Sequence, residues 1–495
     1  MFDFHQLLKV LAYDANQPLL FNSSFFLYFL FLFFLGYTLL RNTGLIRIIF
    51  VSAFSLYFFY KACGWYVGLI LLSAVVDYHI SHWIDRTQKQ THRKLLLIFS
   101  LVINLGLLAY FKYTDFFIEI VNDFQQSNIK PLQLLLPVGI SFYTFENISY
   151  TIDVYRKDFK PVTRFWDYLF FLSFFPKLMM GPIVRAADFI PQIRKKVQLS
   201  SENVSQGLWM ILSGCFKKIV ISDYLSTHLV NVVFDDPLRY SGIECLFAVY
   251  GYAMVIYCDF SGYSDMAIGI AKWMGIDVNV NFLAPYQSKS VTEFWRRWHI
   301  SLSSWLRDYL YISMGGNRKG EIRTYFNLFL TMLIGGLWHG ASWNFVFWGA
   351  AHGLALGFDK IRVAVFKPKI KNENQVKPSF LKHFFQVFFT FHFVCFLWIF
   401  FKAESFSIAG DLIGQIVYHI NWNMMGIFIS NYFYFLMMLL LAFTLHFLPL
   451  HWNDLVVTKT IHWHWSIKAI AMILILLLVS QFNQNEVIKP IYLQF

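Results

Sequence analysis

The chain has 495 residues, of which 57% are hydrophobic and only 14% are charged, whereas soluble domains carry roughly a quarter of charged residues. This balance excludes a water-soluble domain, a disordered chain, a collagen and a coiled coil. The formal net charge of +12, without a basic stripe or zinc-finger spacing, indicates contact with anionic lipid headgroups and not with nucleic acid.

After a short amphipathic start at Met1 to Leu20, the chain is predicted to enter the membrane repeatedly. Each apolar stretch is expected to be helical, because backbone amides in hydrocarbon must be satisfied within the segment. The first stretch has no small-residue cleavage site behind it and is expected to be a retained span. The predicted stretches are 25–40, 45–60, 64–84, 95–111, 132–150, 166–184, 207–222, 244–258, 326–358, 383–401, 432–449 and 466–481.

Two stretches do not fit a simple zigzag. The positions 326–356 are too many for one upright span and contain Gly335, Gly336 and Gly340, so we expect a broken or re-entrant helix there. Short basic loops are placed on the cytoplasmic side, but only the stretch 166–184 separates two of them. Either that stretch dips in and returns, or one basic cluster is shielded by protein.

No internal repeat divides the chain, and the whole of 1–495 is predicted to be one membrane domain. The soluble-looking connections are Lys367–Pro378 and the polar patch Gln125–Lys130. The five cysteines are scattered through apolar stretches without a C-x-x-C pair, so we expect small buried side chains and neither disulfides nor a zinc site. The histidines near the last span, His451, His462 and His464, are typical of a membrane interface and need no metal.

Ionisable groups inside apolar segments cost about 3 kcal/mol each, so they indicate function. In Met332–Gly349, His339 lies beside Trp338 and near Trp343, between glycines. A neutral imidazole at this place can accept a proton, and the glycines let a substrate approach the backbone. The alternative is a packed histidine hydrogen-bonded to a neighbouring carbonyl.

A second polar segment, Thr292–Met314, is predicted to be one interfacial helix with a basic face. His299 is either part of a site or an anchor at the headgroup level. Arg307 and Asp308 are adjacent, so we expect them to point to different sides of the helix and to pair elsewhere. The following turn, Gly315–Arg318, is equally compatible with phosphate binding and with a solvated loop.

A third polar segment, Tyr257–Ile268, contains Asp259 and Asp265. Six positions apart, the two carboxylates do not share a helix face, which argues against an acid and base couple. One of them is instead expected to pair with an arginine. The chain has no G-x-S-x-G, H-E-x-x-H, Walker A or G-x-G-x-x-G motif, so the corresponding chemistries have no support.

Five stretches together carry a resemblance to a known family. They are LPVGISFYTFENISYTIDVYR (136–156), FFPKLMMGPIVRAADFIPQ (174–192), YCDFSGYSDMAIG (257–269), FWRRWHISLSSWLRDYLYISMGGNRKG (294–320) and NLFLTMLIGGLWHGASWNFVFWGAAHG (327–353). The chain resembles the membrane-bound O-acyltransferase (MBOAT) family, in the bacterial branch of alginate O-acetylation and teichoic acid D-alanyl transfer proteins. The resemblance implies an all-α polytopic fold of about 11 to 13 spanning or re-entrant helices around a tunnel, with 132–358 as its catalytic core.

The resemblance also assigns residues. It implies that His339 is the catalytic histidine and His299 the second functionally important position. The further residues expected to bind donor or acceptor are Trp298, Trp338, Arg296, Arg297, Asn317, Arg318, Ser301 and Asp308, with the arginines holding phosphates. The chain departs from the branch at Lys177, at Met179 and Met180, and at Cys258.

The implied reaction is acyl transfer, with His339 as general base on an acceptor hydroxyl. We expect no tightly bound cofactor, an acetyl-CoA or phosphopantetheinyl carrier donor, and a polysaccharide or peptidoglycan acceptor. An SGNH-type periplasmic partner and a bacterial inner-membrane location are also implied. The alternatives are D-alanyl transfer to teichoic acid, a proton-coupled transporter and a structural scaffold. A transporter is expected to have ion-binding carboxylates within its spans and repeated halves, and the sequence indicates neither.

Overall fold

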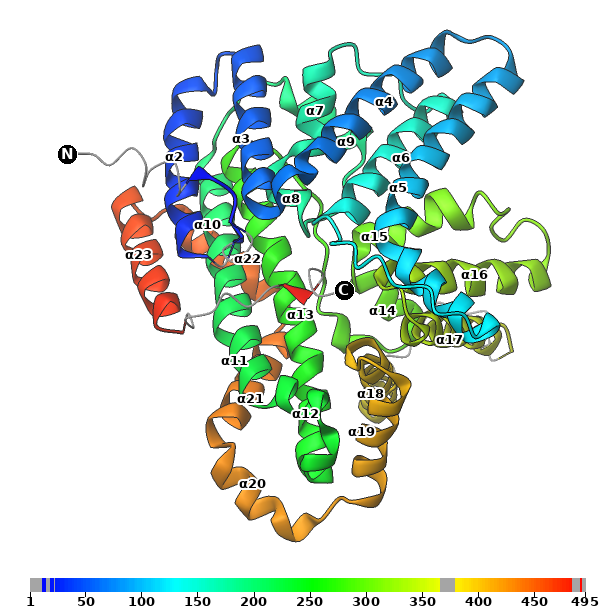
Figure 1. The fold of residues 1–495 in the computed structure, drawn as a ribbon. Helices are drawn as coiled ribbons and strands as arrows, with labels where there is room; N and C mark the ends of the chain where they lie inside the picture. The colour runs from blue at the N-terminus through cyan, green and yellow to red at the C-terminus, as the bar shows by residue number, and fades with distance from the viewer. Residues whose placement is uncertain (1–10, 15–17, 22, 366–378, 483–489, 492–495) are drawn as a thin grey trace, which may run out of the picture.

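The computed structural model describes residues 11–14, 18–21, 23–365, 379–482 and 490–491. Every regular element in this part of the chain is a helix (Figure 1), as the continuous apolar stretches predicted. Most of the expected amphipathic start and the whole connection Lys367–Pro378 lie outside the described residues.

The first eight helices are α2 (Ser24–Leu40), α3 (Leu45–Cys63), α4 (Val67–Arg86), α5 (Gln90–Gln125), α6 (Ile140–Arg156), α7 (Phe165–Ser173), α8 (Phe175–Leu178) and α9 (Ala186–Ile193). Of these, α2 to α5 match predicted apolar stretches, α6 begins only at Ile140 within the stretch 132–150, and α9 lies outside the predicted stretches. The stretch 166–184 forms two helices of 9 and 4 residues followed by extended chain, whereas a span needs about 20 residues. This segment therefore does not cross as one helix, which favours the interpretation that it dips in and returns.

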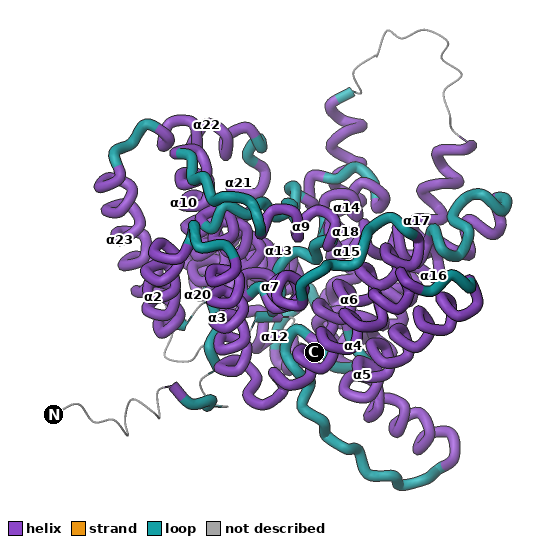
Figure 2. The backbone as a smooth tube through the Cα atoms, turned by 90° about the horizontal axis from the view of Figure 1, so that it is seen from above, coloured by secondary structure: helices purple, strands orange, loops and turns teal. Residues whose placement is uncertain are grey.

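Two long helices pass through the middle of the molecule. One runs over Ser201–Asp235, and the other is α13 (Gly242–Trp273). Seen from two directions, α2, α3, α10 (Ser201–Cys215), α22 (His451–Ile461) and α23 (Trp465–Phe482) lie to one side of α13 (Figures 1 and 2). The other side holds α4, α5, α6, α16 (Glu321–His339) and α17 (Trp343–Val365). The first long helix consists of α10 (Ser201–Cys215), a π-helix (Phe216–Ser222), α11 (Asp223–Leu225), a second π-helix (Ser226–Val230) and α12 (Asn231–Asp235).

Lysines, and not the predicted arginine, neutralise the carboxylates of α13. Lys218 Nζ lies 2.7 Å from Asp223 and also pairs with the buried Asp259, and Lys217 Nζ lies 2.6 Å from Asp265. The arginine prediction is wrong because neither of these two long helices contains an arginine. The neighbouring helix instead brings two consecutive lysines to the depth of the carboxylates.

The predicted interfacial helix over 292–314 is not continuous. It is divided at His299, whose φ of +43° lies outside the range of an α-helix. The elements of this half are α14 (Val291–Arg297), α15 (Ile300–Trp305), a π-helix (Leu306–Tyr311), α16 (Glu321–His339), α17 (Trp343–Val365), α18 (Phe380–Lys402), α19 (Phe406–Tyr418), α20 (Met425–Asn431), α21 (Phe433–Phe447), α22 (His451–Ile461) and α23 (Trp465–Phe482). Short 3-10 turns cover Gly64–Tyr66, Pro237–Arg239, Pro285–Gln287 and Trp422–Met424.

The long apolar stretch 326–358 forms two helices, α16 and α17, which are separated just after His339. The predicted break is confirmed at Gly340. The prediction of interruptions at Gly335 and Gly336 is wrong, because both lie inside α16. A Cβ on Gly336 would come within 2.8 Å of the Gly349 Cα, so the glycine is needed for the close approach of α16 and α17.

The protein is a multi-pass membrane protein. Five of the described helices are long and apolar enough to cross a membrane, or six if the bent pair Trp422–Asn431 and Phe433–Phe447 is one span. Contrary to the expectation of no carboxylate within the spans, Asp77 on α4 and Asp259 on α13 are buried. Asp77 accepts hydrogen bonds from Ser100 and Asn104, and Asp259 is paired with a lysine, so both are satisfied within the protein.

Replacing Lys218 by Met leaves two carboxylates, Asp223 and Asp259, buried without their cation. Removing one partner of a buried ion pair leaves an uncompensated charge in the interior. We therefore expect the free energy of unfolding to fall by about 3–5 kcal/mol. Lys217→Met is the matched control, since the side chains of Lys217 and Asp265 are 27% and 19% exposed and we expect a loss of about 1 kcal/mol or less. Thermal unfolding in detergent measures both variants, and equal losses would contradict the assignment.

Candidate active site

A small pocket lies at the C-terminal end of α16, where the chain breaks before α17. Its cavity volume is about 60 Å³, which is far below the roughly 300–1,000 Å³ of drug-sized ligand sites. The pocket therefore has room for a small group only. It is lined by Lys112, Leu136, Pro137, Val138, Gly139, Ile140, Ser141, Phe142, Met179, Trp338 and His339.

Two side chains of α5 hold the end of α16 in place. Lys112 Nζ donates hydrogen bonds to the carbonyl oxygens of Trp338 and His339, at 2.6 and 2.9 Å. Tyr113 Oη donates to the carbonyl oxygen of Leu337 at 2.7 Å. The last carbonyls of a helix have no partner within the helix, and a lysine also complements the negative end of the helix dipole. These bonds fix the backbone that carries His339.

His339 is 3% exposed, and its side chain lies in an aromatic cage. Its ring centroid is 5.0 Å from that of Trp338, 5.1 Å from that of Trp348 and 5.3 Å from that of Phe401, each in an edge-to-face arrangement. Such packing fixes the orientation of the ring. The predicted catalytic histidine is therefore held at a pocket wall.

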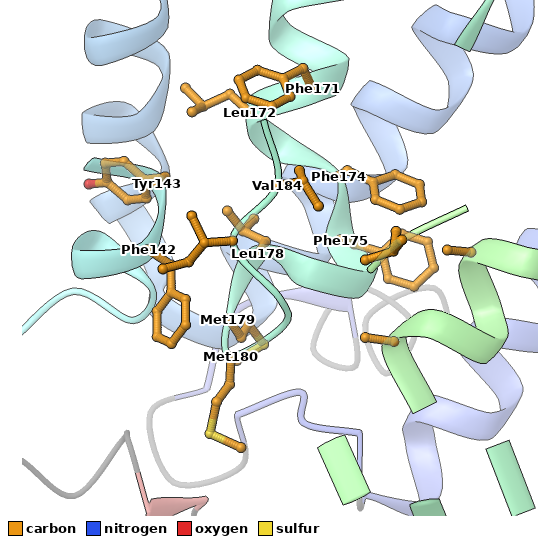
Figure 3. Packing of buried hydrophobic residues seen from close by; sticks show 14 of the residues in the cluster. Phe142, Tyr143, Phe171, Leu172, Phe174, Phe175, Leu178, Met179, Met180 and Val184 are labelled. Carbon is orange, nitrogen blue, oxygen red and sulfur yellow. The ribbon is translucent and has the colours of Figure 1, made fainter. Parts of the chain in front are cut away.

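The wall of the pocket that does not belong to α16 includes the first turn of α6. Gly139 precedes this helix with φ of +73°, and a Cβ there would come within 2.5 Å of the Leu178 carbonyl oxygen. Figure 3 shows Phe142 of this turn beside Leu178 and Met179. Within this turn, Ile140 N and Phe142 N donate to the carbonyl oxygens of Pro137 and Gly139, at 3.2 and 2.9 Å. The turn therefore offers the pocket the partial positive charge of a helix N-terminus.

His299 lies nearby but is not among the residues that line the pocket. Its Nδ1 is 3.3 Å from Asn281 Oδ1, and that oxygen also accepts hydrogen bonds from Ser301 N at 3.1 Å and Ser301 Oγ at 2.9 Å. The rings of His299 and His339 both contact Trp338, at centroid distances of 6.2 and 5.0 Å. One indole thus connects the two histidines that the sequence singled out.

Ser301 and Trp298 have contacts that position the polypeptide. Ser301 Oγ also accepts a hydrogen bond from Ile183 N at 3.1 Å, which joins α15 to the chain after α8. Trp298 is 1% exposed and packs against Phe282 and Trp398. Neither residue lines the pocket, and substrate binding by them stays a prediction.

The predicted phosphate-binding residues lie elsewhere. Arg296, Asn317 and Arg318 are exposed, and Arg297 pairs with Glu293 at 2.7 Å. None of them lines the pocket. Their role in holding phosphates stays a prediction. Arg296, Asn317 and Arg318 are open to a ligand that approaches from outside the pocket.

Asp308 belongs to an ion-pair cluster. It pairs with Arg185 at 3.2 Å and with Arg307 at 2.7 Å. The prediction that Arg307 and Asp308 pair elsewhere is therefore wrong for Arg307. The sequence argument assumed an ordinary α-helix, whereas Leu306–Tyr311 is a π-helix, and a long arginine side chain reaches its neighbour.

Lys112, Asn281 and the role of Gly139 were not predicted from the sequence. Lys112 directly follows the apolar stretch 95–111, where a lysine ordinarily marks a membrane boundary. Asn281 lies in a loop far from His299 along the chain. For Gly139, the signal in the sequence was its position before a predicted helix in LPVGISF, since a glycine there often has positive φ.

Lys177, which departs from the family pattern, pairs with Glu146 in the interior. The Glu146 carboxylate also accepts a hydrogen bond from Val184 N at 3.3 Å. The pair therefore joins α6 and α8 behind the pocket wall. All five cysteines are free and buried, as predicted. Among the described residues, no group of three or more His, Cys, Asp or Glu side chains is placed to hold a metal ion.

Known proteins are similar to most of this chain. Residues 162–401 match the model of the membrane-bound O-acyltransferase family. The peptidoglycan O-acetyltransferase of Helicobacter pylori is 36% identical over 421 residues, which cover 79% of this chain and 78% of that protein. The probable alginate O-acetylase of Pseudomonas putida is 39% identical over 82% of both chains. The teichoic acid D-alanyltransferase of Bacillus subtilis is 28% identical over 57% of this chain and 72% of its own.

Asn281→Ala removes the oxygen that accepts hydrogen bonds from Ser301 beside His299. Because buried donors are left unsatisfied, we expect the free energy of unfolding to fall by about 2–3 kcal/mol. Asn317→Ala is the control, since Asn317 is exposed and surface changes stay within about 0.5 kcal/mol. Thermal unfolding in detergent compares the two, and an Asn281→Ala protein as stable as Asn317→Ala would contradict the positioning role of Asn281.

Proposed function

The chain belongs to the membrane-bound O-acyltransferase family and is an O-acyltransferase, and we propose that it transfers an acetyl group from a thioester to a glycan hydroxyl. The observation that carries the proposal is the placement of His339 in the same small pocket as the first turn of α6. This arrangement puts a proton acceptor beside a source of positive potential, which acyl transfer needs.

In the proposed reaction, the His339 imidazole takes the proton from the acceptor hydroxyl. The hydroxyl oxygen forms a bond to the thioester carbonyl carbon, and the carbon–sulfur bond then breaks. The thiolate leaves and receives the proton from the imidazolium, which returns the imidazole to its neutral form. A histidine suits this role because its ordinary pKa near 6.5 leaves it mostly unprotonated at neutral pH.

We propose that the negative charge on the carbonyl oxygen is stabilised from the other wall of the pocket. The first turn of α6, starting at Ile140, provides the positive end of the helix dipole. Lys112, which also lines the pocket, adds a donor that is already fixed by its bonds to the end of α16. Both groups are in place before the reaction, so little reorganisation is needed as the charge forms.

The pocket favours an acetyl over a D-alanyl group. Both are small, but a D-alanyl group carries an ammonium. Among the described residues that line the pocket there is no carboxylate, whereas the Lys112 amine and the positive end of α6 would oppose a second cation. The higher identity to the O-acetyltransferases than to the D-alanyltransferase supports the same choice, with D-alanyl transfer as the alternative.

Further parts of the proposal rest on family membership. We propose a bacterial inner-membrane location, acetyl-CoA or a phosphopantetheinyl carrier as donor, and alginate, peptidoglycan or a related glycan as acceptor. The acetyl group reaches the glycan acceptor directly or through an SGNH-type periplasmic partner. Arg296, Arg297 and Arg318 would bind donor phosphates. The catalytic core is 132–358, to which the pocket adds Lys112 from outside that range.

His339→Ala removes the proposed base. We expect the rate of acetyl transfer in proteoliposomes to fall by about 10²–10⁴-fold, the usual contribution of a general base, with unchanged membrane insertion. The assay follows radiolabel from acetyl-CoA to an alginate or peptidoglycan oligosaccharide. His451→Ala, on α22 where the side chain is exposed, is the control and should retain full activity.

The same preparation tests the rival functions. A carrier-bound D-alanyl thioester that is used faster than acetyl-CoA would favour D-alanyl transfer. Proton flux through the wild-type protein without any acyl donor, together with absent transfer, would favour a transporter. Full acetyl transfer by the His339→Ala protein would exclude this imidazole as the base.

Lys112→Met tests the stabilisation of the carbonyl oxygen. We expect kcat to fall by about 10²–10³-fold, since this is the range for loss of one oxyanion donor. Tyr113→Phe is the matched control, because it removes only the hydrogen bond to the Leu337 carbonyl and leaves the pocket donors in place. Both variants are compared at equal folded fraction, measured by gel filtration. Equal kcat values for the two would contradict the role of Lys112.

A further inference from the structure

A second cluster of polar groups lies next to His339 but outside the pocket. Trp348 contacts the His339 ring at a centroid distance of 5.1 Å and the His352 ring at 4.7 Å. Trp348 and His352 are 1% and 0% exposed. Neither residue lines the small pocket. A line of alternating imidazole and indole rings therefore leads from the base into α17.

The hydrogen bonding of His352 defines its tautomer. Trp295 Nε1 donates to His352 Nδ1 at 3.3 Å, so Nδ1 acts as an acceptor. In a neutral imidazole the other nitrogen then carries the hydrogen. The ring neighbours of His352 are aromatic, namely Phe294, Trp295, Trp348 and Phe393. His352 thus presents an N–H group at Nε2.

Two buried donors in this cluster have no acceptor in the part of the chain that the structure describes. They are His352 Nε2 and Trp348 Nε1. Buried polar groups are nearly always hydrogen-bonded, and leaving a donor unsatisfied is costly. Two such donors in contacting residues, one of which touches the catalytic imidazole, indicate a place where an oxygen-rich ligand binds.

We propose that Trp348 Nε1 and His352 Nε2 bind oxygen atoms of the acceptor sugar beside its reacting hydroxyl. This inference rests on the proposed function and adds the acceptor subsite to it. The two groups donate and cannot accept hydrogen bonds, so they hold oxygen lone pairs and leave the hydroxyl hydrogen to His339. The acyl group lies on the Trp338 side of the imidazole, in the pocket, and the acceptor lies on the Trp348 side.

Trp348→Phe and Trp398→Phe form the decisive pair. Trp398 is equally buried, at 1% exposed, but its Nε1 already donates to Tyr286 Oη at 3.2 Å. With an oligomannuronate or a peptidoglycan oligosaccharide as the acceptor, we expect Trp348→Phe to lower kcat/KM for the acceptor at least about tenfold. The KM for acetyl-CoA should be unchanged. Trp398→Phe should leave the acceptor kinetics within twofold of wild type.

For thermal stability we expect the opposite order, with Trp398→Phe the more damaging of the two substitutions. Both substitutions remove the same ring volume, but only Trp398→Phe breaks a hydrogen bond, whereas Trp348→Phe removes an unsatisfied donor. We therefore expect a higher thermal unfolding midpoint for Trp348→Phe than for Trp398→Phe. An ordinary packing role for Trp348 would lower stability without changing the KM for the acceptor.

His352 is tested by two amides of different length. Asn places its oxygen near the position of Nδ1 and keeps the acceptor for Trp295, while Gln places its amide N–H near the position of Nε2. We expect His352→Gln to retain the acceptor KM and His352→Asn to raise it about tenfold or more.

Unchanged acceptor kinetics in both Trp348→Phe and His352→Asn would overturn the subsite and would indicate that buried water satisfies the donors. This outcome is distinguishable from failure of the proposed function. If the proposed function fails, the His339→Ala protein retains acetyl transfer, whatever the kinetics of the Trp348 and His352 variants.

Discussion

The site depends on how a helix end is satisfied inside a membrane protein. The break after His339 leaves the last carbonyls of α16 without intrahelical partners, and hydrocarbon offers none. Lys112 and Tyr113 supply the donors from α5, just after its apolar stretch 95–111. The requirement to satisfy these carbonyls thus fixes the position of α16 against α5, and with it the wall that carries the imidazole.

The remaining walls depend on contacts of the same kind. A glycine pair, Gly336 and Gly349, lets α16 and α17 approach closely, which brings Trp348 of α17 against the His339 ring. The buried pair of Glu146 and Lys177 joins α6 to α8 behind the other wall. Removing either charge would leave the other unpaired in the interior, so these ions define where the first turn of α6 lies.

Much of the helical architecture follows from hydrophobicity alone, since a continuous apolar stretch in a membrane has to be helical. The breaks were less predictable. A glycine permits both a helix end and a close helix contact, so Gly340 and Gly336 have different roles although both belong to the same apolar stretch. The bend at His299 depends on hydrogen bonds to Asn281, which is distant along the chain and gives no local signal.

The sequence pointed to His339 because a titratable group in an apolar stretch is costly and therefore informative, and the structure places this residue buried at a pocket wall. Its partners were not predicted. Lysine at the end of an apolar stretch usually marks a membrane boundary, and arginine near a tryptophan-rich helix usually suggests a phosphate site. In the structure the lysine lines the pocket, whereas Arg296 and Arg318 are exposed away from it. Sequence patterns locate costly residues, but tertiary contacts decide which of them face a substrate.

The polar groups around His339 are of two kinds, those whose hydrogen bonds are satisfied within the protein and those whose donors are not. Lys112 and Tyr113 have their hydrogen bonds in place and so contribute to stability as well as to position. Trp348 and His352 present donors that folding alone does not satisfy, and such groups persist where a ligand makes up the loss. An acyltransferase needs both kinds. The end of α16 must be rigid before the substrates arrive, while the acceptor must gain its binding energy from groups that have been kept available.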